Sequence, residues 1–124
     1  MKYFLFLLLF PVLSASDCGK KKKNADQPGT GKDSLPACVR ELITKAEQEE
    51  PPNPPVQVDA YLYRGKTVYL FTMDCCDFFN TVYDDSCRVI CAPSGGITGR
   101  GDGQCPGFAD SARLIQTVWQ AGKK

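Results

Sequence analysis

The sequence predicts an α+β fold, in which one N-terminal amphipathic helix packs on a small antiparallel sheet of four to five strands that disulfides staple together. Three features predict it: apolar residues at helical spacing after Pro36, two alternating segments joined by a short turn, and cysteines spread over the same region. We place this single domain at residues 34–121. Because so short a chain buries a modest share of its surface, cross-links are expected to stabilise it.

The helix is predicted to begin after Asp33 or Ser34, either of which can cap it, with Pro36 in its first turn. The prolines of residues 51–55 end it, because proline removes a helix hydrogen bond and clashes with the preceding turn. One face of the helix is apolar and is expected to point toward the core. Its residues are Cys38, Val39, Leu42, Ile43 and Ala46.

Residues 56–63 alternate strictly between apolar and polar side chains, and residues 67–73 are rich in strand-forming residues. The turn at 64–66 between them predicts a β-hairpin. Its aromatic side chains are expected to form a ladder across one face. They are Tyr61, Tyr63, Tyr69 and Phe71.

Two further strands are predicted at residues 78–83 and 87–91, separated by a turn. Near the C-terminus, Asp110 is expected to start a short turn or helix. The β-branched and aromatic residues that follow then predict a closing strand through Trp119.

The N-terminus has the pattern of an export signal. Residues 1–16 contain Lys2, an apolar run and small residues at the end. The run is shorter than the roughly 20 residues that a membrane-spanning helix needs. Residues 17–33 are predicted to be a disordered polar tether. Cys18, at the start of this tether, is a candidate for lipidation, which would make the chain a cell-envelope lipoprotein; plain secretion is the alternative.

The chain has seven cysteines, an odd number for an oxidising compartment. Setting Cys18 aside leaves enough for three disulfides, and the sequence leaves their pairing open. The six cysteines are Cys38, Cys75, Cys76, Cys87, Cys91 and Cys105.

Composition removes several classes of function. The chain has no histidine, so no imidazole can serve as catalytic base or metal ligand, and we expect no enzymatic activity and no cofactor. The formal net charge is +1 and the basic residues are clustered, which argues against a nucleic-acid partner. We expect a monomer that binds an unidentified protein or small ligand, with no contact to the membrane beyond a lipid on Cys18.

Residues 93–105 form a glycine-rich loop in which Arg100 and Asp102 are the candidate binding residues, because the need for tight turns does not explain them. Calcium binding is an alternative, since carboxylates are hard oxygen ligands, although their spacing matches no calcium loop and no metal site is firm. The candidate ligands are Asp77, Asp84, Asp85 and Asp102.

A second alternative is protease inhibition. The spacing of Cys76, Tyr83, Cys87 and Cys91 resembles the second half of a Kazal inhibitor domain. The cysteine that such a domain places eight positions before Cys76 is replaced here by valine.

A longer string of residues resembles the signature of a small family of uncharacterised, cysteine-rich domains from exported and mainly bacterial proteins, many of them lipoproteins. The string begins at Cys75-Cys76-Asp77 and ends at Cys105-Pro106 and Phe108. Between them it reads Tyr83-Asp84, Cys87, Ile90-Cys91, Pro93, Gly95-Gly96-Ile97-Thr98-Gly99 and Gly101-Asp102-Gly103. The resemblance implies export and a cysteine framework and carries no activity. We therefore expect an exported, non-enzymatic binding module.

Overall fold

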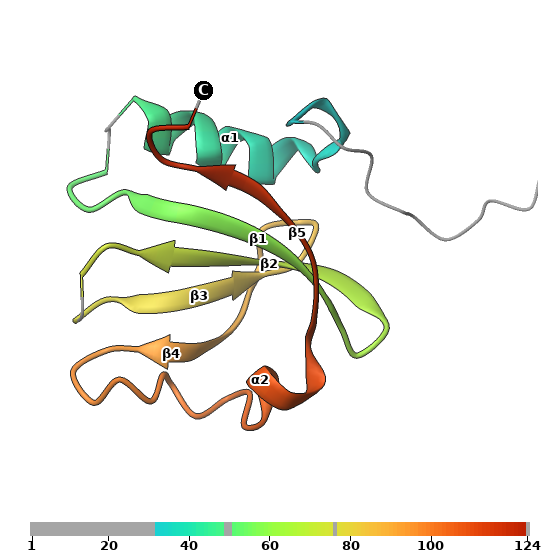
Figure 1. Ribbon diagram of the computed structural model, residues 1–124, viewed down its shortest axis with the longest axis vertical. Coiled ribbons are helices and arrows are strands. Elements are labelled where there is room, and N and C mark those ends of the chain that lie inside the picture. Colours follow the sequence, from blue (N-terminus) through green and yellow to red (C-terminus); the bar gives the residue numbers. More distant parts are fainter. Residues whose placement is uncertain (1–31, 49–50, 76, 124) are drawn as a thin grey trace, which may run out of the picture.

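The computed structural model describes residues 32–48, 51–75 and 77–123, and its centre is one antiparallel sheet with the strand order β4-β3-β2-β1-β5. Figure 1 shows helix α1 on one side of this sheet and the short helix α2 on the other. The strands are β1 (Pro55–Tyr63), β2 (Lys66–Met73), β3 (Phe79–Tyr83), β4 (Val89–Gly95) and β5 (Arg113–Gln120). The helices are a 3-10 turn η1 (Lys32–Ser34), α1 (Ala37–Glu47) and α2 (Phe108–Ser111).

The predicted α+β fold of an N-terminal helix packed on a sheet is wrong. The fold is dominated by the five-stranded sheet, with α1 as a single short helix of 11 residues, a four-residue turn of helix at α2, and two disulfides. The physical reason is that the sheet has a buried core on each side. Helix α1 contributes to one of these cores and the other forms without it.

The predicted hairpin is confirmed as β1 and β2, but the aromatic ladder is wrong. The register places Tyr61 opposite Val68 and Ala60 opposite Tyr69. Because neighbouring residues of a strand point to opposite faces, Tyr61 and Tyr63 belong to one side of the sheet, and Tyr69 and Phe71 belong to the other.

The core on the α1 side is made by helix and strand residues of the N-terminal half. Val39 and Ile43 of α1 and Val58 and Ala60 of β1 are fully buried there. The helix begins at Ala37, with Pro36 in the N-cap position and no side-chain cap. Residues Asp33 and Ser34, predicted as caps, instead lie in η1, so the helix starts later than the sequence indicates.

The core on the opposite side is closed by the segment after β4. Phe108 of α2 is buried there, with its ring 4.9 Å from that of Tyr63 and 5.5 Å from that of Tyr61. The Cys91–Cys105 disulfide lies in the same cluster and ties β4 to the segment that leads into α2. This side of the molecule is therefore covered by a cross-linked loop.

The closing strand after Asp110 is confirmed as β5, which pairs with β1 after the short helix α2. Asp59 of β1, which is only 5% exposed, lies opposite Thr117 of β5. Thr117 donates a hydrogen bond of 2.6 Å to one of its carboxylate oxygens, and Gln57 donates one of 2.7 Å to the other. The burial of this carboxylate is therefore compensated on both oxygens.

Two of the three predicted disulfides are present, and their pairing is Cys38–Cys87 and Cys91–Cys105. Cys75 is exposed just after β2, and Cys76 falls outside the described residues, so a third disulfide stays a prediction. The predicted signal at 1–16, most of the tether and Cys18 also lie outside the described residues. Within the described part of the chain, we find no helix that is both long and apolar enough to span a membrane.

The glycine-rich loop folds back along β4. Gly101 has a φ of +73°, and a Cβ added there would lie 1.9 Å from the carbonyl oxygen of Ala92. Gly103 has nearly the same φ of +74°, yet a Cβ added at this position would meet nothing within 4 Å. The positive φ favours glycine at both positions. Of the two, only Gly101 also lies too close to a neighbouring backbone to accept a side chain.

We predict that Gly103→Ala lowers the free energy of unfolding by about 1–2 kcal/mol, the usual cost of a left-handed alanine. Gly101→Ala should lower it by roughly a further 1–3 kcal/mol, because the added methyl group displaces the loop from β4. Urea denaturation of the two variants measures the difference. Equal losses would show that the loop does not contact β4 closely at Gly101.

Candidate functional site

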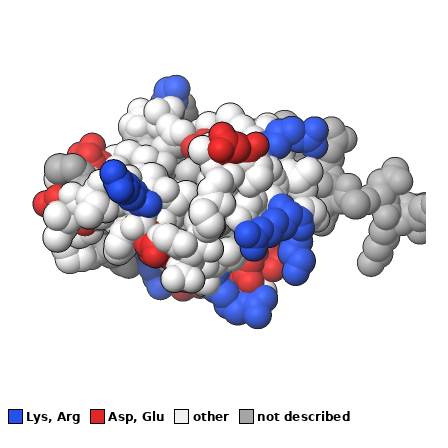
Figure 2. Space-filling model, turned by 90° about the horizontal axis from the view of Figure 1, so that it is seen from below, with Lys and Arg blue, Asp and Glu red and all other residues white. Residues whose placement is uncertain are grey.

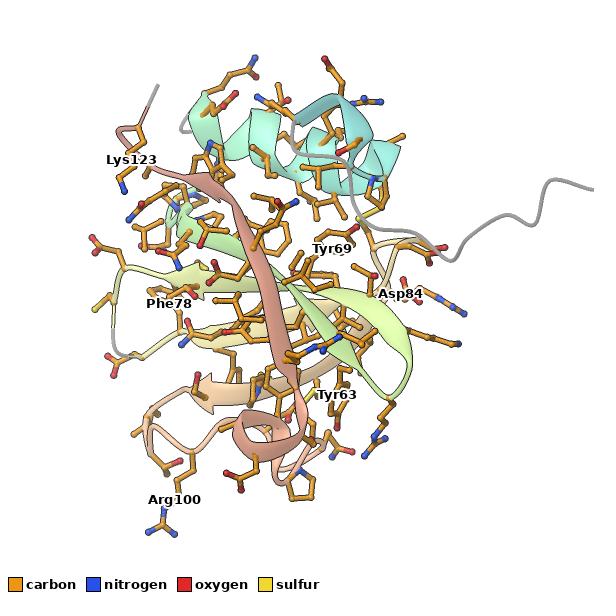
Figure 3. The ribbon with its side chains drawn as sticks, turned by 45° about the vertical axis from the view of Figure 1, so that its right-hand side comes forward. Tyr63, Tyr69, Phe78, Asp84, Arg100 and Lys123 are labelled. Carbon is orange, nitrogen blue, oxygen red and sulfur yellow. A yellow bond between two sulfur atoms is a disulfide. The ribbon has the colours of Figure 1, made fainter. Side chains whose placement is uncertain are left out.

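The two residues that the sequence proposed for binding have different roles. Both carboxylate oxygens of Asp102 are used inside the loop: one accepts a hydrogen bond from the Ala92 N–H and the other from the Gln104 N–H, each 2.9 Å long. Arg100 extends from the loop away from the body of the molecule (Figure 3). Asp102 therefore holds the loop in place, and Arg100 presents its charged group to solvent.

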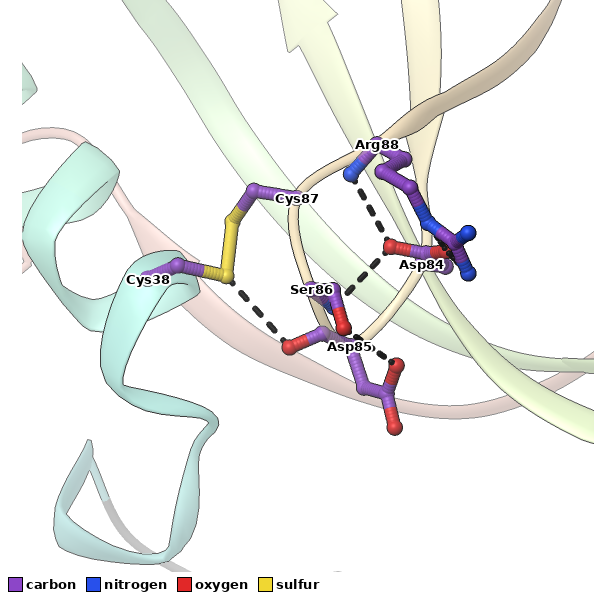
Figure 4. Close-up of a disulfide and its surroundings, with 6 residues drawn as sticks. All are labelled: Cys38, Asp84, Asp85, Ser86, Cys87 and Arg88. Atoms are coloured by element: carbon purple, nitrogen blue, oxygen red, sulfur yellow. Dashed lines mark hydrogen bonds and ion pairs between the residues drawn. A yellow bond between two sulfur atoms is a disulfide. The ribbon is translucent and has the colours of Figure 1, made fainter.

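Asp84 is likewise occupied by its own turn (Figure 4). Its carboxylate accepts hydrogen bonds from the backbone N–H groups of Ser86 and Arg88 and pairs with the Arg88 guanidinium at 2.7 Å. The hydrogen bond from the Arg88 N–H leads the interactions that hold the pKa of Asp84 below its ordinary value. The turn also carries Cys87, whose disulfide partner Cys38 lies in α1.

The four aspartates proposed for calcium are not brought together. Asp84 and Asp85 lie in the turn before β4, Asp77 precedes β3, and Asp102 lies in the glycine-rich loop. Across residues 32–48, 51–75 and 77–123, no three His, Cys, Asp or Glu side chains form a group that could hold a metal ion.

The disulfides link the Kazal-like cysteines that the structure describes to partners outside the pattern. Cys87 is bonded to Cys38, and Cys91 is bonded to Cys105, so both of these cysteines of the pattern pair with partners outside it. Tyr83 lies on β3, where its ring meets that of Phe71 edge-on at 5.1 Å.

A pocket of about 530 Å³ lies between the glycine-rich loop, α2 and the sheet. Its lining includes Tyr61, Pro93, Arg100 and Phe108. Burial, with the charge of Asp59 as a second cause, raises the pKa of Tyr61 above its ordinary value. The charged residues of the lining are Arg100 and Asp110. Figure 2 views the molecule from below and shows a largely uncharged face, with basic and acidic side chains gathered together at its lower right.

The structure reveals a different site, which we call the α1 groove, with a volume of about 410 Å³. It lies where the C-terminal half of α1 faces β2 and β3, and the proline-rich connector after α1 forms its rim. Figure 1 shows α1 lying along the β1 side of the sheet. The groove residues are Leu42, Lys45, Pro51, Asn53, Pro55, Phe71, Met73, Thr81 and Tyr83.

The α1 groove has an apolar floor and a polar rim. Phe71 is buried beneath it, while Met73 and Tyr83 are half-buried and present part of their surface. Lys45 is exposed at the rim and pairs with Glu41 at 3.2 Å, an ion pair that solvent screens. This combination of aromatic, thioether and aliphatic surface with few polar groups is typical of small-molecule sites.

No sequence pattern indicates the α1 groove, because its residues come from four separate segments. Helical spacing assigns Leu42 only to the core-facing stripe of the helix, and Phe71 and Tyr83 are predicted only as strand residues. Their proximity depends on where α1 is fixed over the sheet. At the C-terminal end of α1, the Trp119 indole N–H donates a hydrogen bond to Glu47, which also forms an ion pair with Lys32. The hydrogen bond from Lys32 is the largest cause that lowers the pKa of Glu47.

Comparison with known proteins gives one family. The family model described as domain of unknown function DUF6970 matches residues 44–121, from within α1 to just after β5. Neither the curated proteins nor the solved structures contain a match to this chain. The matched segment covers all five strands and every described cysteine except Cys38. Since it spans more than half of the chain, the chain belongs to the DUF6970 family.

Proposed function

We propose that this protein is an exported, non-enzymatic binding domain whose α1 groove holds a small apolar ligand with one acidic group. The observation that carries the proposal is the groove itself: half-buried Met73 and Tyr83 remain exposed to a ligand above the buried ring of Phe71. Ordinary monomer surface seldom contains an exposed apolar concavity of this kind, whereas small-molecule binding sites commonly do.

The size of the groove limits the ligand. A volume of about 410 Å³ lies in the lower part of the range of roughly 300–1,000 Å³ for small-molecule sites. It suits one ring system or a short alkyl chain. A protein partner could insert only a side chain or two there.

The rim supplies the acidic preference. Lys45 is the charged residue of the groove, and its pairing with exposed Glu41 is weak enough to yield to a ligand anion. Thr81 and Asn53 add a hydroxyl group and an amide that can donate hydrogen bonds to the same anion. The expected ligand is therefore an aromatic or aliphatic carboxylate or sulfonate.

We expect binding of the apolar sulfonate dye 1-anilinonaphthalene-8-sulfonate to weaken about tenfold in Leu42→Glu, because the substitution replaces apolar wall by charge. Ile97→Glu is the matched control, since Ile97 is 94% exposed and lies outside the groove. Lys45→Gln should weaken the sulfonate several-fold and leave the neutral dye Nile red unchanged. Fluorescence titration measures all three. Equal loss in Leu42→Glu and Ile97→Glu would refute the groove as the site.

Export is the second part of the proposal. Disulfides form in an oxidising, extracytoplasmic compartment. The resemblance of residues 75–108 to a family of domains from exported, mainly bacterial proteins, many of them lipoproteins, supports the same location. A signal at residues 1–16 and a lipid on Cys18 would place the domain at the cell envelope, with the polar tether between lipid and domain; without the lipid it is secreted.

Intact mass of the natively expressed protein tests this location. We predict a mass that lacks residues 1–16 or 1–17 and that falls by two hydrogen atoms for each disulfide. An added diacylglyceryl mass on a chain that begins at Cys18 identifies the lipoprotein form, and its absence identifies the secreted form. A full-length, fully reduced chain would contradict export.

A further inference from the structure

We propose that the Cys38–Cys87 disulfide is a thiol–disulfide exchange site, which a reduced dithiol partner opens to release the first turns of α1 from the sheet. The Cys91–Cys105 disulfide stays closed under the same conditions. The two bridges differ in exposure, in the cavity beside them and in the thiolate that opening would release.

The Cys38–Cys87 bridge lies at the surface of the molecule. Both of its cysteines are half-buried, and Asp85 in the same turn is exposed. Figure 4 shows the bridge between the first turn of α1 and the turn before β4. In contrast, Cys91 is 1% exposed and Cys105 is 6% exposed, within the core on the α2 side. Because an attacking thiolate has to reach a sulfur atom, exposure favours exchange at Cys38–Cys87.

A cavity of about 790 Å³ lies beside this bridge. Its lining includes Pro36, Asp85 and Arg88, which are one or two positions away from the two cysteines in the sequence. The Asp85 carbonyl oxygen lies 3.4 Å from the Cys38 Sγ, so the bridge contacts a residue of the cavity wall. The cavity therefore gives a thiol-bearing segment of a partner a place to enter.

The released thiolate separates the two bridges further, because Cys105 also lines a pocket, the one between the glycine-rich loop and α2. Cys38 is the second residue of α1, whose first turn has no acidic side chain and no side-chain cap. The positive end of the helix dipole stabilises a thiolate at this position. Attack on Cys105 would instead release a Cys91 thiolate among buried apolar side chains, which disfavour its charge.

Opening this bridge should free the start of α1 without unfolding the sheet. Cys38 lies outside the family-matched residues 44–121, whereas Cys91–Cys105 lies entirely within them. The C-terminal end of α1 has its own link to the sheet, the hydrogen bond from the Trp119 indole to Glu47. At the other end, the bridge adds to the burial of Val39.

The exchange needs no reactant other than the dithiol. A thiolate of the partner attacks the Cys87 Sγ, and a mixed disulfide forms as the Cys38–Cys87 bond breaks. The electron pair of that bond leaves on Cys38, which takes up a proton. The second thiol of the partner then attacks the partner's own sulfur in the mixed disulfide and releases Cys87 as a thiol. Both cysteines are reduced, and the partner is oxidised to a disulfide.

Timed alkylation of the full oxidised chain in dithiothreitol, read by peptide mass, tests the choice of bridge. Cys38 and Cys87 should become alkylated about tenfold faster than Cys91 and Cys105, because exposure and the leaving thiolate both favour them. Equal rates, or faster opening of Cys91–Cys105, would overturn the proposal.

The direction of attack is tested with the monothiol 2-mercaptoethanol and a rapid acid quench, which preserves the mixed disulfide. We expect the adduct on Cys87, since Cys38 is the better leaving group. An adduct mainly on Cys38 would show that the helix end does not direct the exchange.

Hydrogen–deuterium exchange in the same dithiothreitol time course measures the release of α1. Residues 37–43 should exchange faster as the Cys38 thiol appears, while residues 55–73 stay protected. In the control variant Cys38→Ala/Cys87→Ala, residues 37–43 should exchange fast from the start and show no response to dithiothreitol. If residues 37–43 of the parent stay protected after the bridge has opened, its opening does not release α1.

Discussion

The structure depends on two disulfides that fix a cover on each side of one sheet. Cys38–Cys87 joins α1 to the turn before β4, and Cys91–Cys105 joins β4 to the segment that leads into α2. Neither cover is large: α1 has three buried residues and α2 has one. Covers of this size gain little stability from buried apolar surface alone. The cross-links add stability because they reduce the conformational entropy of the unfolded chain. The position of α1 also defines the groove proposed for ligands.

Local sequence patterns predicted individual elements well. The alternation of residues 56–63 indicated β1, and the β-branched run after Asp110 indicated β5, because strand pairing depends on nearby chemistry. The fold class and the aromatic ladder were wrong, since both depend on how elements are arranged. A one-residue difference in hairpin register sends Tyr61 and Tyr69 to opposite faces, and composition does not determine that register.

The candidate site was harder to predict. Aspartates in turns are chemically suited to bind ligands, yet here Asp84 and Asp102 bind backbone N–H groups of their own loops. Short polar side chains in turns commonly make such bonds, so local spacing alone could indicate this role. The α1 groove brings Leu42 beside Phe71 and Tyr83, which lie roughly 30 to 40 positions farther along the chain. No local motif records such a contact, because it depends on a disulfide whose pairing the sequence left open.

Each disulfide fixes the cover of one face, and we expect the sheet to stay folded when either disulfide is removed. Hydrogen–deuterium exchange of Cys38→Ala/Cys87→Ala and of Cys91→Ala/Cys105→Ala tests it most directly. The first variant should exchange faster in residues 37–47 and the second in residues 96–112, with the β1–β2 hairpin protected in both. Uniform loss of protection over the whole sheet in either variant, or no local change, would contradict this claim.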